Sequence, residues 1–248
     1  MTPYYSRNGI VIYHADCRDV LPTLEAGSID LVLTDPDYNG RNIGVGDRTY
    51  ESGMPQMPPD EYRAWCQEWF GLAQRLTSRI ALSCGIRNIW NYPPARWVLA
   101  WVKPGAVVYN GTGGFNVWEP ILLYGEGIPK VVLDVYTSTP RNLTRGPERG
   151  HPCPKNPGLW EWLLASISRP GETVLDPFLG SGTTAVVAKK LGRHCIGIEI
   201  EEKYCEIAVA RLRQEAWVTD EQCYDPDADA KQGTLLDDAP ARAPILMR

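Results

Sequence analysis

The 248-residue chain contains no apolar run close to the roughly 18 residues that a membrane-spanning helix needs. Its first residues, Met1 to Tyr13, also lack the basic and then apolar layout of a secretion signal. We therefore expect a cytoplasmic protein with no membrane partner. The hydrophobic content of 44% is enough for the core of one α/β domain.

Cysteine spacing excludes two further classes of protein. The seven cysteines form no CxxC pair and no metal-ligand spacing, and their odd number argues against a disulfide framework. We expect reduced, structural cysteines and no metal site.

The chain also has no excess of positive charge, because its formal net charge is −5. Residues 216–248 carry seven acidic and three basic side chains, which leaves the rest of the chain nearly neutral. This Pro-, Ala- and Asp-rich stretch predicts a disordered acidic tail after a domain over residues 1–215. Contact with a nucleic acid would have to come from local basic patches.

A glycine-containing turn is the first candidate binding site. The segment Thr173 to Thr184 predicts a buried strand that ends at Asp176, a turn through Gly180 and Gly182, and the start of a helix. Glycines let the backbone approach a ligand closely, and free N–H groups at a helix start favour an electron-rich group. A plain strand-to-helix connection is the alternative. Ala185 replaces the third glycine of the dinucleotide fingerprint, a substitution that the fingerprint tolerates.

Two more strands end in carboxylates. Residues 194–199 predict a strand ending in Glu199, whose carboxylate suits two ribose hydroxyls. Residues 9–13 predict another strand, followed by Asp16 at the start of a short helix. Together with the glycine turn, the strand that ends in Glu199 makes half of a nucleoside-binding α/β unit.

A third motif combines a carboxylate with an aromatic ring. The apolar strand at 29–34 leads into Asp35, Pro36, Asp37 and Tyr38, at the sheet edge where ligands bind. A carboxylate and a restrained backbone carbonyl can each accept one N–H of an exocyclic amine, which localises the nitrogen lone pair for in-line attack on a sulfonium methyl. The tyrosine ring can stack on a base swung out of a duplex.

These motifs together resemble the beta class of amino DNA methyltransferases. Residues 35–38 resemble its Asp/Asn/Ser-Pro-Pro-Tyr/Phe motif, residues 176–184 its S-adenosylmethionine loop, and residues 151–155 its His-Pro-x-x-Lys motif. The catalytic motif precedes the cofactor loop, which is the circularly permuted order of that class. The resemblance covers about residues 9–213.

The resemblance implies a Rossmann-like class I methyltransferase fold. In that α/β fold a mostly parallel seven-stranded sheet has a reversed last strand and helices on both faces. S-adenosylmethionine would be the cofactor and duplex DNA the substrate, with Asp35, Pro36 and Tyr38 as catalytic residues. The cofactor contacts that it implies are Asp16, Lys155, Asp176, Phe178, Gly180, Ser181, Gly182, Thr183 and Glu199. A helix N-cap is the alternative role of Asp16, and a structural turn with a surface lysine is that of Lys155.

The chain departs from the family pattern at Asp37, where a second proline is usual. Either the side chain points to solvent and is tolerated, or it loosens the turn and places negative charge beside the base. An acidic first residue in this motif is associated more with adenine than with cytosine, so Asp35 predicts methylation of adenine N6. Methylation of cytosine N4 and a non-catalytic cofactor- or DNA-binding module are the alternatives. A nicotinamide-dependent oxidoreductase is disfavoured, because no hydride-transfer constellation lies near the glycine turn.

Two aperiodic segments are candidates for DNA contact. Residues 39–59 predict a mobile loop after the catalytic motif, and residues 126–150 correspond to the family's target-recognition segment, with a solvated loop as the alternative. Arginine suits phosphate contact and guanine readout. The predicted DNA contacts are Arg41, Arg48, Arg141, Arg145 and Arg149. Since the second segment is short, we expect a short recognition sequence, help from the first segment, or a second subunit in a homodimer. Such enzymes occur in restriction systems and as solitary, including phage-borne, proteins.

Three further expectations concern local structure. Asp60 is expected to cap a helix from Glu61 to about Leu76 that buries an aromatic face. Residues 88–101 predict a helix interrupted by two prolines, and residues 106–125 predict two strands around a glycine-rich turn.

Overall fold

The computed structural model describes residues 1–39, 57–104, 108–109, 114–127, 133–138 and 156–214. Internal contacts divide the chain into the units Met1–Glu215 and Ala216–Arg248. The second unit lies outside the described residues, as do most of the two candidate DNA-contact segments. The domain boundary, the acidic tail and the mobile loop therefore stay predictions.

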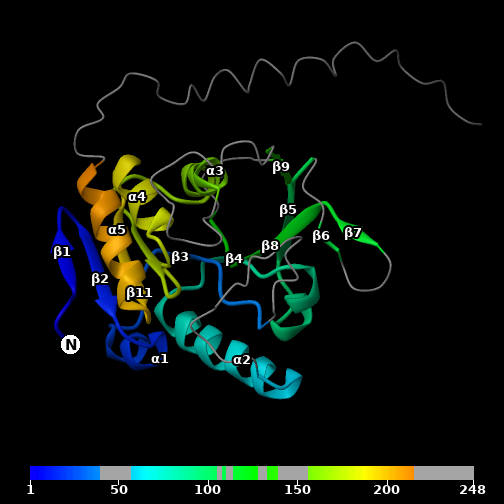
Figure 1. The fold of residues 1–248 in the computed structure, drawn as a ribbon, viewed down its shortest axis with the longest axis horizontal. Coiled ribbons are helices and arrows are strands. Elements are labelled where there is room, and N and C mark those ends of the chain that lie inside the picture. The colour runs from blue at the N-terminus through cyan, green and yellow to red at the C-terminus, as the bar shows by residue number, and fades with distance from the viewer. Residues whose placement is uncertain (40–56, 105–107, 110–113, 128–132, 139–155, 215–248) are drawn as a thin grey trace, which may run out of the picture. The chain divides into compact units, whose positions relative to one another are not determined.

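One nine-stranded sheet organises the described residues, in the order β1-β2-β11-β10-β3-β4-β8-β5-β9 (Figure 1). The neighbours β2, β11, β10, β3 and β4 are parallel, whereas β8 runs antiparallel to both β4 and β5. This confirms the predicted mostly parallel class I sheet, in which β8 and the edge strand β1 are reversed. Short strands β1 and β9 extend its two edges beyond the seven predicted strands. The strands are β1 (Tyr5–Arg7), β2 (Ile10–His14), β3 (Leu31–Thr34), β4 (Ile80–Ser83), β5 (Trp97–Val102), β8 (Trp118–Tyr124), β9 (Val135–Thr137), β10 (Thr173–Asp176) and β11 (His194–Glu199), with β6 (Val108–Tyr109) and β7 (Phe115–Asn116) in a separate two-stranded ribbon.

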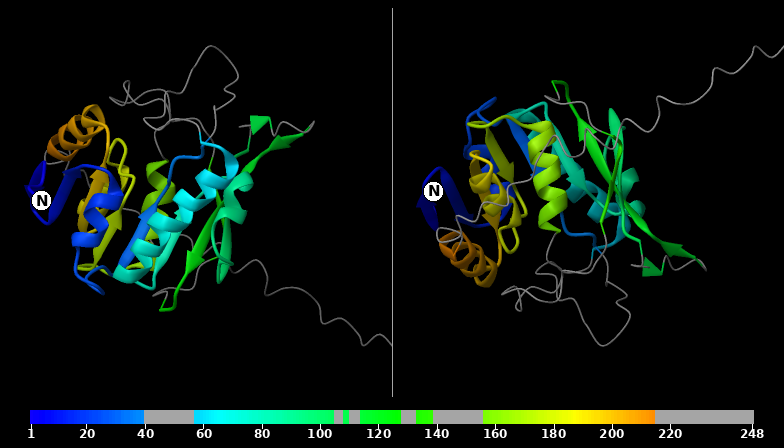
Figure 2. Two further views of the ribbon diagram at one scale, coloured as in Figure 1. Left: turned by 90° about the horizontal axis from the view of Figure 1, so that it is seen from below. Right: turned by 90° about the horizontal axis from the view of Figure 1, so that it is seen from above.

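Helices cover both faces of the sheet, as predicted (Figures 1 and 2). Buried residues of α3, α4 and α5 share a hydrophobic cluster with one face, and those of α1 and α2 share a second cluster with the other. Every residue of β3 and β4 is buried, which is typical of parallel strands covered on both sides. The helices are α1 (Cys17–Val20), α2 (Pro59–Leu76), α3 (Pro157–Ile167), α4 (Thr183–Lys190) and α5 (Glu202–Gln214), with 3₁₀ turns η1 (Leu21–Thr23) and η2 (Ile86–Asn91).

The predicted helix over residues 88–101 is wrong. The chain forms the 3₁₀ helix η2 and then strand β5, which pairs along its length with β8. The apolar residues of β5 fit a helical spacing as well as a strand, and only pairing with a distant strand decides between them. The cap predicted for α2 is also wrong, because Pro58 takes the N-cap position and Asp60 lies in the first turn.

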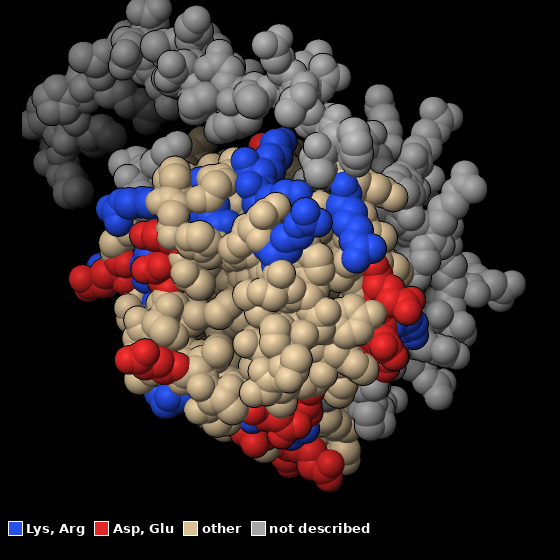
Figure 3. Space-filling model, turned by 90° about the vertical axis from the view of Figure 1, so that its left-hand side faces the viewer, with Lys and Arg blue, Asp and Glu red and all other residues tan. Residues whose placement is uncertain are grey.

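Basic side chains gather on one part of the surface (Figure 3), and helices α4 and α5 carry basic residues in their last turns. Figure 3 shows Lys and Arg gathered toward the top of this face, with Asp and Glu mainly below and at the flanks. Helix α5 begins with Glu202 and ends with Arg211 and Arg213, and α4 ends with Lys189 and Lys190. The charges at the ends of these two helices complement the helix dipoles.

Within the described ranges, no helix is long and apolar enough to cross a membrane. The cysteines of the same ranges are buried free thiols, and no group of potential ligand side chains there could hold a metal ion.

Candidate active site

Four acidic residues follow four adjacent parallel strands. Asp16 follows β2, Glu199 ends β11, Asp176 ends β10 and Asp35 follows β3. Because these strands are parallel neighbours, their carboxyl ends meet at one edge of the sheet. Backbone and side-chain bonds tie the ends together: the Ala15 N–H donates to the Glu199 carbonyl at 3.0 Å. The fold therefore brings these four acidic residues to one edge of the sheet, where the sequence predicts Asp35 to lie.

Glu199 holds the glycine turn by its side chain. One carboxylate oxygen accepts the Gly180 N–H and the other accepts the Glu201 N–H, both at 2.8 Å. Gly180 and Gly182 adopt positive φ angles of 54° and 84°, which glycine reaches without strain. Burial raises the pKa of Glu199, although the backbone N–H donors oppose that shift. The result is a buried carboxylate directly beside a backbone turn.

Asp176 anchors the start of the same turn. Its side chain is almost fully buried, and it accepts hydrogen bonds from the Thr34 hydroxyl at 2.6 Å, the Phe178 N–H at 3.0 Å and the Thr184 hydroxyl at 2.5 Å. The Trp160 indole N–H donates to Thr184 at 2.7 Å. These bonds join β3, β10, α3 and α4, so Asp176 has a structural task. Its direct contact with a cofactor stays a prediction.

Arg211 on α5 supports the turn from its far side. The guanidinium donates to the Ser181 carbonyl at 2.8 Å, to the Ser181 hydroxyl at 3.1 Å and to the Thr183 hydroxyl at 3.2 Å. Ser181 and Thr183, both predicted cofactor contacts, are therefore engaged by the protein itself. The Phe178 ring packs against Trp65 and Trp69 of α2, with ring centroids 5.3 and 5.1 Å away. No sequence signal distinguished Arg211 from other surface arginines.

Asp16 is the N-cap of α1, in accord with the alternative considered for it. Its carboxylate accepts the Arg18 N–H at 2.8 Å and forms an ion pair with the Arg18 guanidinium at 2.7 Å. Hydrogen bonding to Arg18 lowers the pKa of Asp16. A cofactor contact by Asp16 remains compatible with this cap, because a carboxylate has several acceptor positions.

The predicted catalytic motif is organised by the Tyr38 hydroxyl. This hydroxyl donates to Asp35 Oδ1 at 2.6 Å and lies 3.1 Å from Ser83 Oγ at the end of β4. The ring lies against Gly85, where an added Cβ would approach Tyr38 Cε2 to 3.2 Å. Gly85 also has a φ of +67°, which disfavours any side chain there. Asp35 and Tyr38 are thus brought together, and Ser83 and Gly85 join them from a segment to which the sequence assigned no function.

Asp37 forms a hydrogen-bonded turn at the position of the usual proline. Its carboxylate accepts the Asn39 N–H at 2.9 Å, and its backbone carbonyl accepts the Tyr62 hydroxyl. The Asn39 side chain bonds the backbone of Met57 twice, through Nδ2 to the carbonyl at 2.8 Å and through Oδ1 to the N–H at 2.7 Å. Since Asx turns of this type restrain the backbone, Asp37 tightens the motif. This bond argues against the alternative in which Asp37 loosens the turn.

The remaining predicted contacts cannot be placed. Lys155 and the five arginines assigned to DNA lie outside the described residues. They stay predictions, as does the homodimer.

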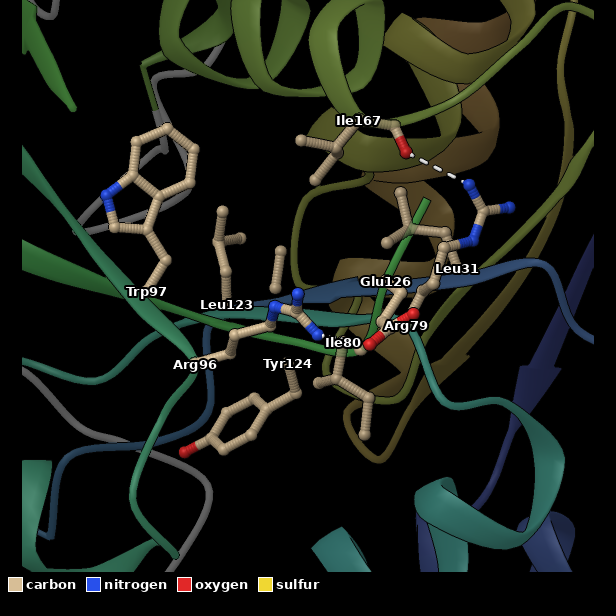
Figure 4. A pocket seen from close by; sticks show the side chains of 11 residues that line it. Leu31, Arg79, Ile80, Arg96, Trp97, Leu123, Tyr124, Glu126 and Ile167 are labelled. Carbon is tan, nitrogen blue, oxygen red and sulfur yellow. Dashed lines mark hydrogen bonds and ion pairs between the residues drawn. The ribbon is translucent and has the colours of Figure 1, made fainter. Parts of the chain in front are cut away.

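A described cavity lies at the opposite edge of the sheet. Its volume is about 230 Å³, and it opens beside the first residues of β3, β4 and β5 (Figure 4). Arg96 and Glu126 form an ion pair at its rim, and Arg79 donates to the Ile167 carbonyl beside it. Because ligands of open α/β sheets bind at the carboxyl ends of the strands, this cavity is not part of the candidate active site.

The residues at the carboxyl edge suit a nucleoside with an electron-rich tail. A buried carboxylate at a strand end, two glycines at positive φ and the start of α4 lie within one turn. S-adenosylmethionine, when bound, supplies a methyl group on a sulfonium centre, and Glu199 with the turn at 180–182 would hold it.

Comparison with known proteins agrees with this geometry. The family model described as "DNA methylase", for N6 and N4 methyltransferases, matches residues 85–210. The Type II methyltransferase M.ScaI of Streptomyces caespitosus is 28% identical over 268 aligned residues, covering 86% of this chain and 84% of that protein. M2.DpnII of Streptococcus pneumoniae is 27% identical, covering 86% of this chain and 93% of that protein.

Solved structures show the same fold. The complex of M1.HpyAVI with SAM is 26% identical and superimposes with a TM-score of 0.58, covering 82% of this chain and 98% of that one. The cytosine-N4-specific PvuII DNA methyltransferase superimposes with a TM-score of 0.66 at 17% identity, over 92% of this chain and 93% of that one. This chain therefore belongs to the DNA methylase family, as a beta-class amino DNA methyltransferase that uses S-adenosylmethionine.

Proposed function

We propose that the enzyme methylates N6 of an adenine that is flipped out of duplex DNA. The observation that carries this proposal is the carboxylate of Asp35, which follows a buried strand and is oriented by the Tyr38 hydroxyl at 2.6 Å. An acidic residue at this position in the family resembled by the sequence is associated more with adenine than with cytosine.

In this proposal each group of the motif has one task. Asp35 accepts one N–H of the exocyclic amine, and the backbone carbonyl restrained by Pro36 accepts the other, so the nitrogen lone pair is directed away from the ring. The Tyr38 ring stacks on the extruded base, while its hydroxyl keeps Asp35 in one orientation. The hydrogen-bonded turn at Asp37 supports an active enzyme over the non-catalytic alternative.

The cofactor would be held at the neighbouring strand ends. We propose that Glu199 contacts the ribose hydroxyls and that the backbone of Gly180 and Gly182 lies against the cofactor. Asp16 lies at the adjoining strand end, whereas Asp176 and Ser181 are joined to the protein's own groups and act chiefly by shaping the turn.

Duplex DNA would be contacted by arginines outside the described residues. We propose Arg141, Arg145 and Arg149 as phosphate or base contacts, with Arg41 and Arg48 beside the catalytic motif. Neutralising the first three should weaken DNA binding and flatten its dependence on salt, because fewer counterions are released. A homodimer could supply further contacts to a substrate of this size, and relatives named Type II methyltransferases support a role in restriction-modification.

Methyl transfer to unmethylated duplex DNA tests the proposal directly. Tritiated S-adenosylmethionine is the donor, and the labelled product is digested to nucleosides and separated. The expected product is N6-methyldeoxyadenosine. N4-methyldeoxycytidine would overturn the base assignment, and an absence of label in DNA would overturn the activity.

A matched pair of variants assigns the role of Asp35. Asp35→Ala should abolish transfer and leave cofactor binding measured by calorimetry unchanged. Glu25→Ala removes an exposed carboxylate between η1 and β3 and should keep full activity. Loss of cofactor binding in folded Asp35→Ala protein would contradict the assigned role.

A further inference from the structure

The 3₁₀ helix η2 presents three distinct faces beside the catalytic motif. Residues three apart eclipse one another in a 3₁₀ helix. Ile86 and Ile89 therefore share the face turned inward, and Ile89 packs against the hydrophobic cluster of α2. Asn88 lies on a second face, where its amide donates to the Tyr38 carbonyl at 3.3 Å. Arg87 and Trp90 share the third face, and both are exposed.

The exposure of Trp90 is unusual in its extent. Trp90 is 80% exposed, whereas Trp65, Trp69 and Trp160 are each at most 5% exposed. Single exposed apolar residues are common on proteins and need no explanation by themselves. Here the tryptophan and an arginine share one face of a short helix, and a ring beside a cation suits stacked bases and phosphates.

The position of this face links it to the reaction. Helix η2 begins directly after Gly85, which touches the Tyr38 ring, and β4 ends at Ser83, whose hydroxyl lies 3.1 Å from the Tyr38 hydroxyl. Any duplex that delivers a base to Asp35 must pass close to this rim of the sheet edge.

Helix η2 is also held firmly at its C-terminal end. Tyr92 follows it and is buried among Trp69 and Phe70, with both ring centroids 5.8 Å away. A side chain that projects from a rigid platform loses less conformational entropy when it binds. Trp90 is thus presented on a fixed support.

We propose that Arg87 and Trp90 form a DNA-contacting ridge that flanks the extruded base. Trp90 stacks against bases next to the one that leaves the duplex, and Arg87 contacts a backbone phosphate. This inference rests on the proposed function, since it needs duplex DNA as the substrate. The ridge adds a contact on the side of the sheet that carries Asp35 and Tyr38.

Binding and turnover of paired variants test the ridge. Fluorescence anisotropy with a short labelled duplex of random sequence gives the affinity at several salt concentrations, and methyl transfer to unmethylated plasmid DNA gives kcat and KM. Trp90→Ala should weaken DNA binding at least about fivefold with an unchanged salt slope, because stacking is lost and no charge is removed. Arg87→Gln should reduce the slope of log affinity against log salt by about 0.9, as for one phosphate contact.

Controls separate a local role from a general loss of structure. Trp90→Phe should restore most of the affinity, and S-adenosylmethionine binding should be unchanged in every variant. Val98→Ala, at an apolar residue near the start of β5 that is 43% exposed, and Arg169→Ala should bind DNA like the wild type, because both residues lie at the opposite edge of the sheet.

The outcomes for the ridge and for the proposed function are distinct. Wild-type DNA affinity and KM in folded Trp90→Ala, or an equal loss in Val98→Ala, would overturn the ridge while methyl transfer by the wild type still supports the function. A wild type that binds DNA but transfers no methyl group would overturn the function, and the binding series would still decide the ridge.

Discussion

Replacing Asp37 by alanine tests how this chain works without the second proline of its catalytic motif. The variant loses the acceptor of the Asn39 N–H, a bond of 2.9 Å that closes the turn containing Tyr38. A hydrogen bond to a charged group contributes about 1.5–3 kcal/mol, and partial exposure of Asp37 reduces this to about 1–2 kcal/mol. If the turn serves to position Asp35 and Tyr38, losing this hydrogen bond raises the activation free energy of methyl transfer by a similar amount.

The expected result is a decrease in kcat of about 5- to 30-fold, with little change in the KM for S-adenosylmethionine. Asp37→Asn keeps an acceptor for the Asn39 N–H and should retain most activity. Asp37→Pro restrains the backbone by its ring and should also be active. Steady-state methyl transfer with each variant measures these values, and Asp60→Ala, an exposed carboxylate in the first turn of α2, is the matched control.

Two results would refute this reasoning about Asp37. Wild-type kcat in the alanine variant would show that the turn does not position the motif. An asparagine variant as slow as the alanine variant would show that charge, and not the turn, is what the reaction needs. Circular dichroism melting of each variant confirms that the comparison is between folded proteins.

Three further predictions follow from contacts at the same edge. Tyr38→Phe removes the bonds to Asp35 and Ser83 but keeps the ring, so kcat should fall about tenfold while duplex binding by anisotropy is unchanged; a tenfold loss of binding instead would contradict the orienting role. Arg211→Ala leaves Ser181 and Thr183 without their donor, and calorimetry should show S-adenosylmethionine affinity reduced roughly 5- to 10-fold, whereas Arg213→Ala on the same helix should show no change. Burial raises the pKa of Glu199 above its ordinary 4.5. As the pH falls, the Glu199 carboxylate of the folded protein therefore binds its proton at a higher pH than the same group in the unfolded chain. The free energy of unfolding of the wild type, relative to Glu199→Gln, should therefore fall as the pH rises from 4.5 through the raised pKa, and urea titrations showing the opposite slope would refute that shift.

Much of the architecture could be predicted from local patterns. The strands that lead to Asp35 and Asp176 are short apolar runs that stop at an acidic residue, and the glycine turn after β10 has a conformational reason for its glycines. Strand β5 could not be predicted in this way, since its residues satisfy two periodicities. Strands β1 and β9 were missed because short edge strands depend almost entirely on the neighbour with which they pair.

The sequence by itself determined which chemistry the chain carries and the order of its motifs, because strand-end carboxylates, glycines at a turn and a tyrosine after a proline have local meanings. Tertiary structure alone decided which groups support them. Arg211 reaches Ser181 from another helix, Ser83 meets Tyr38 from the neighbouring strand, and Asn39 bonds Met57 across a long connection. Each of these contacts joins residues far apart in the chain, so its existence depends on strand register and helix packing, which no local pattern encodes.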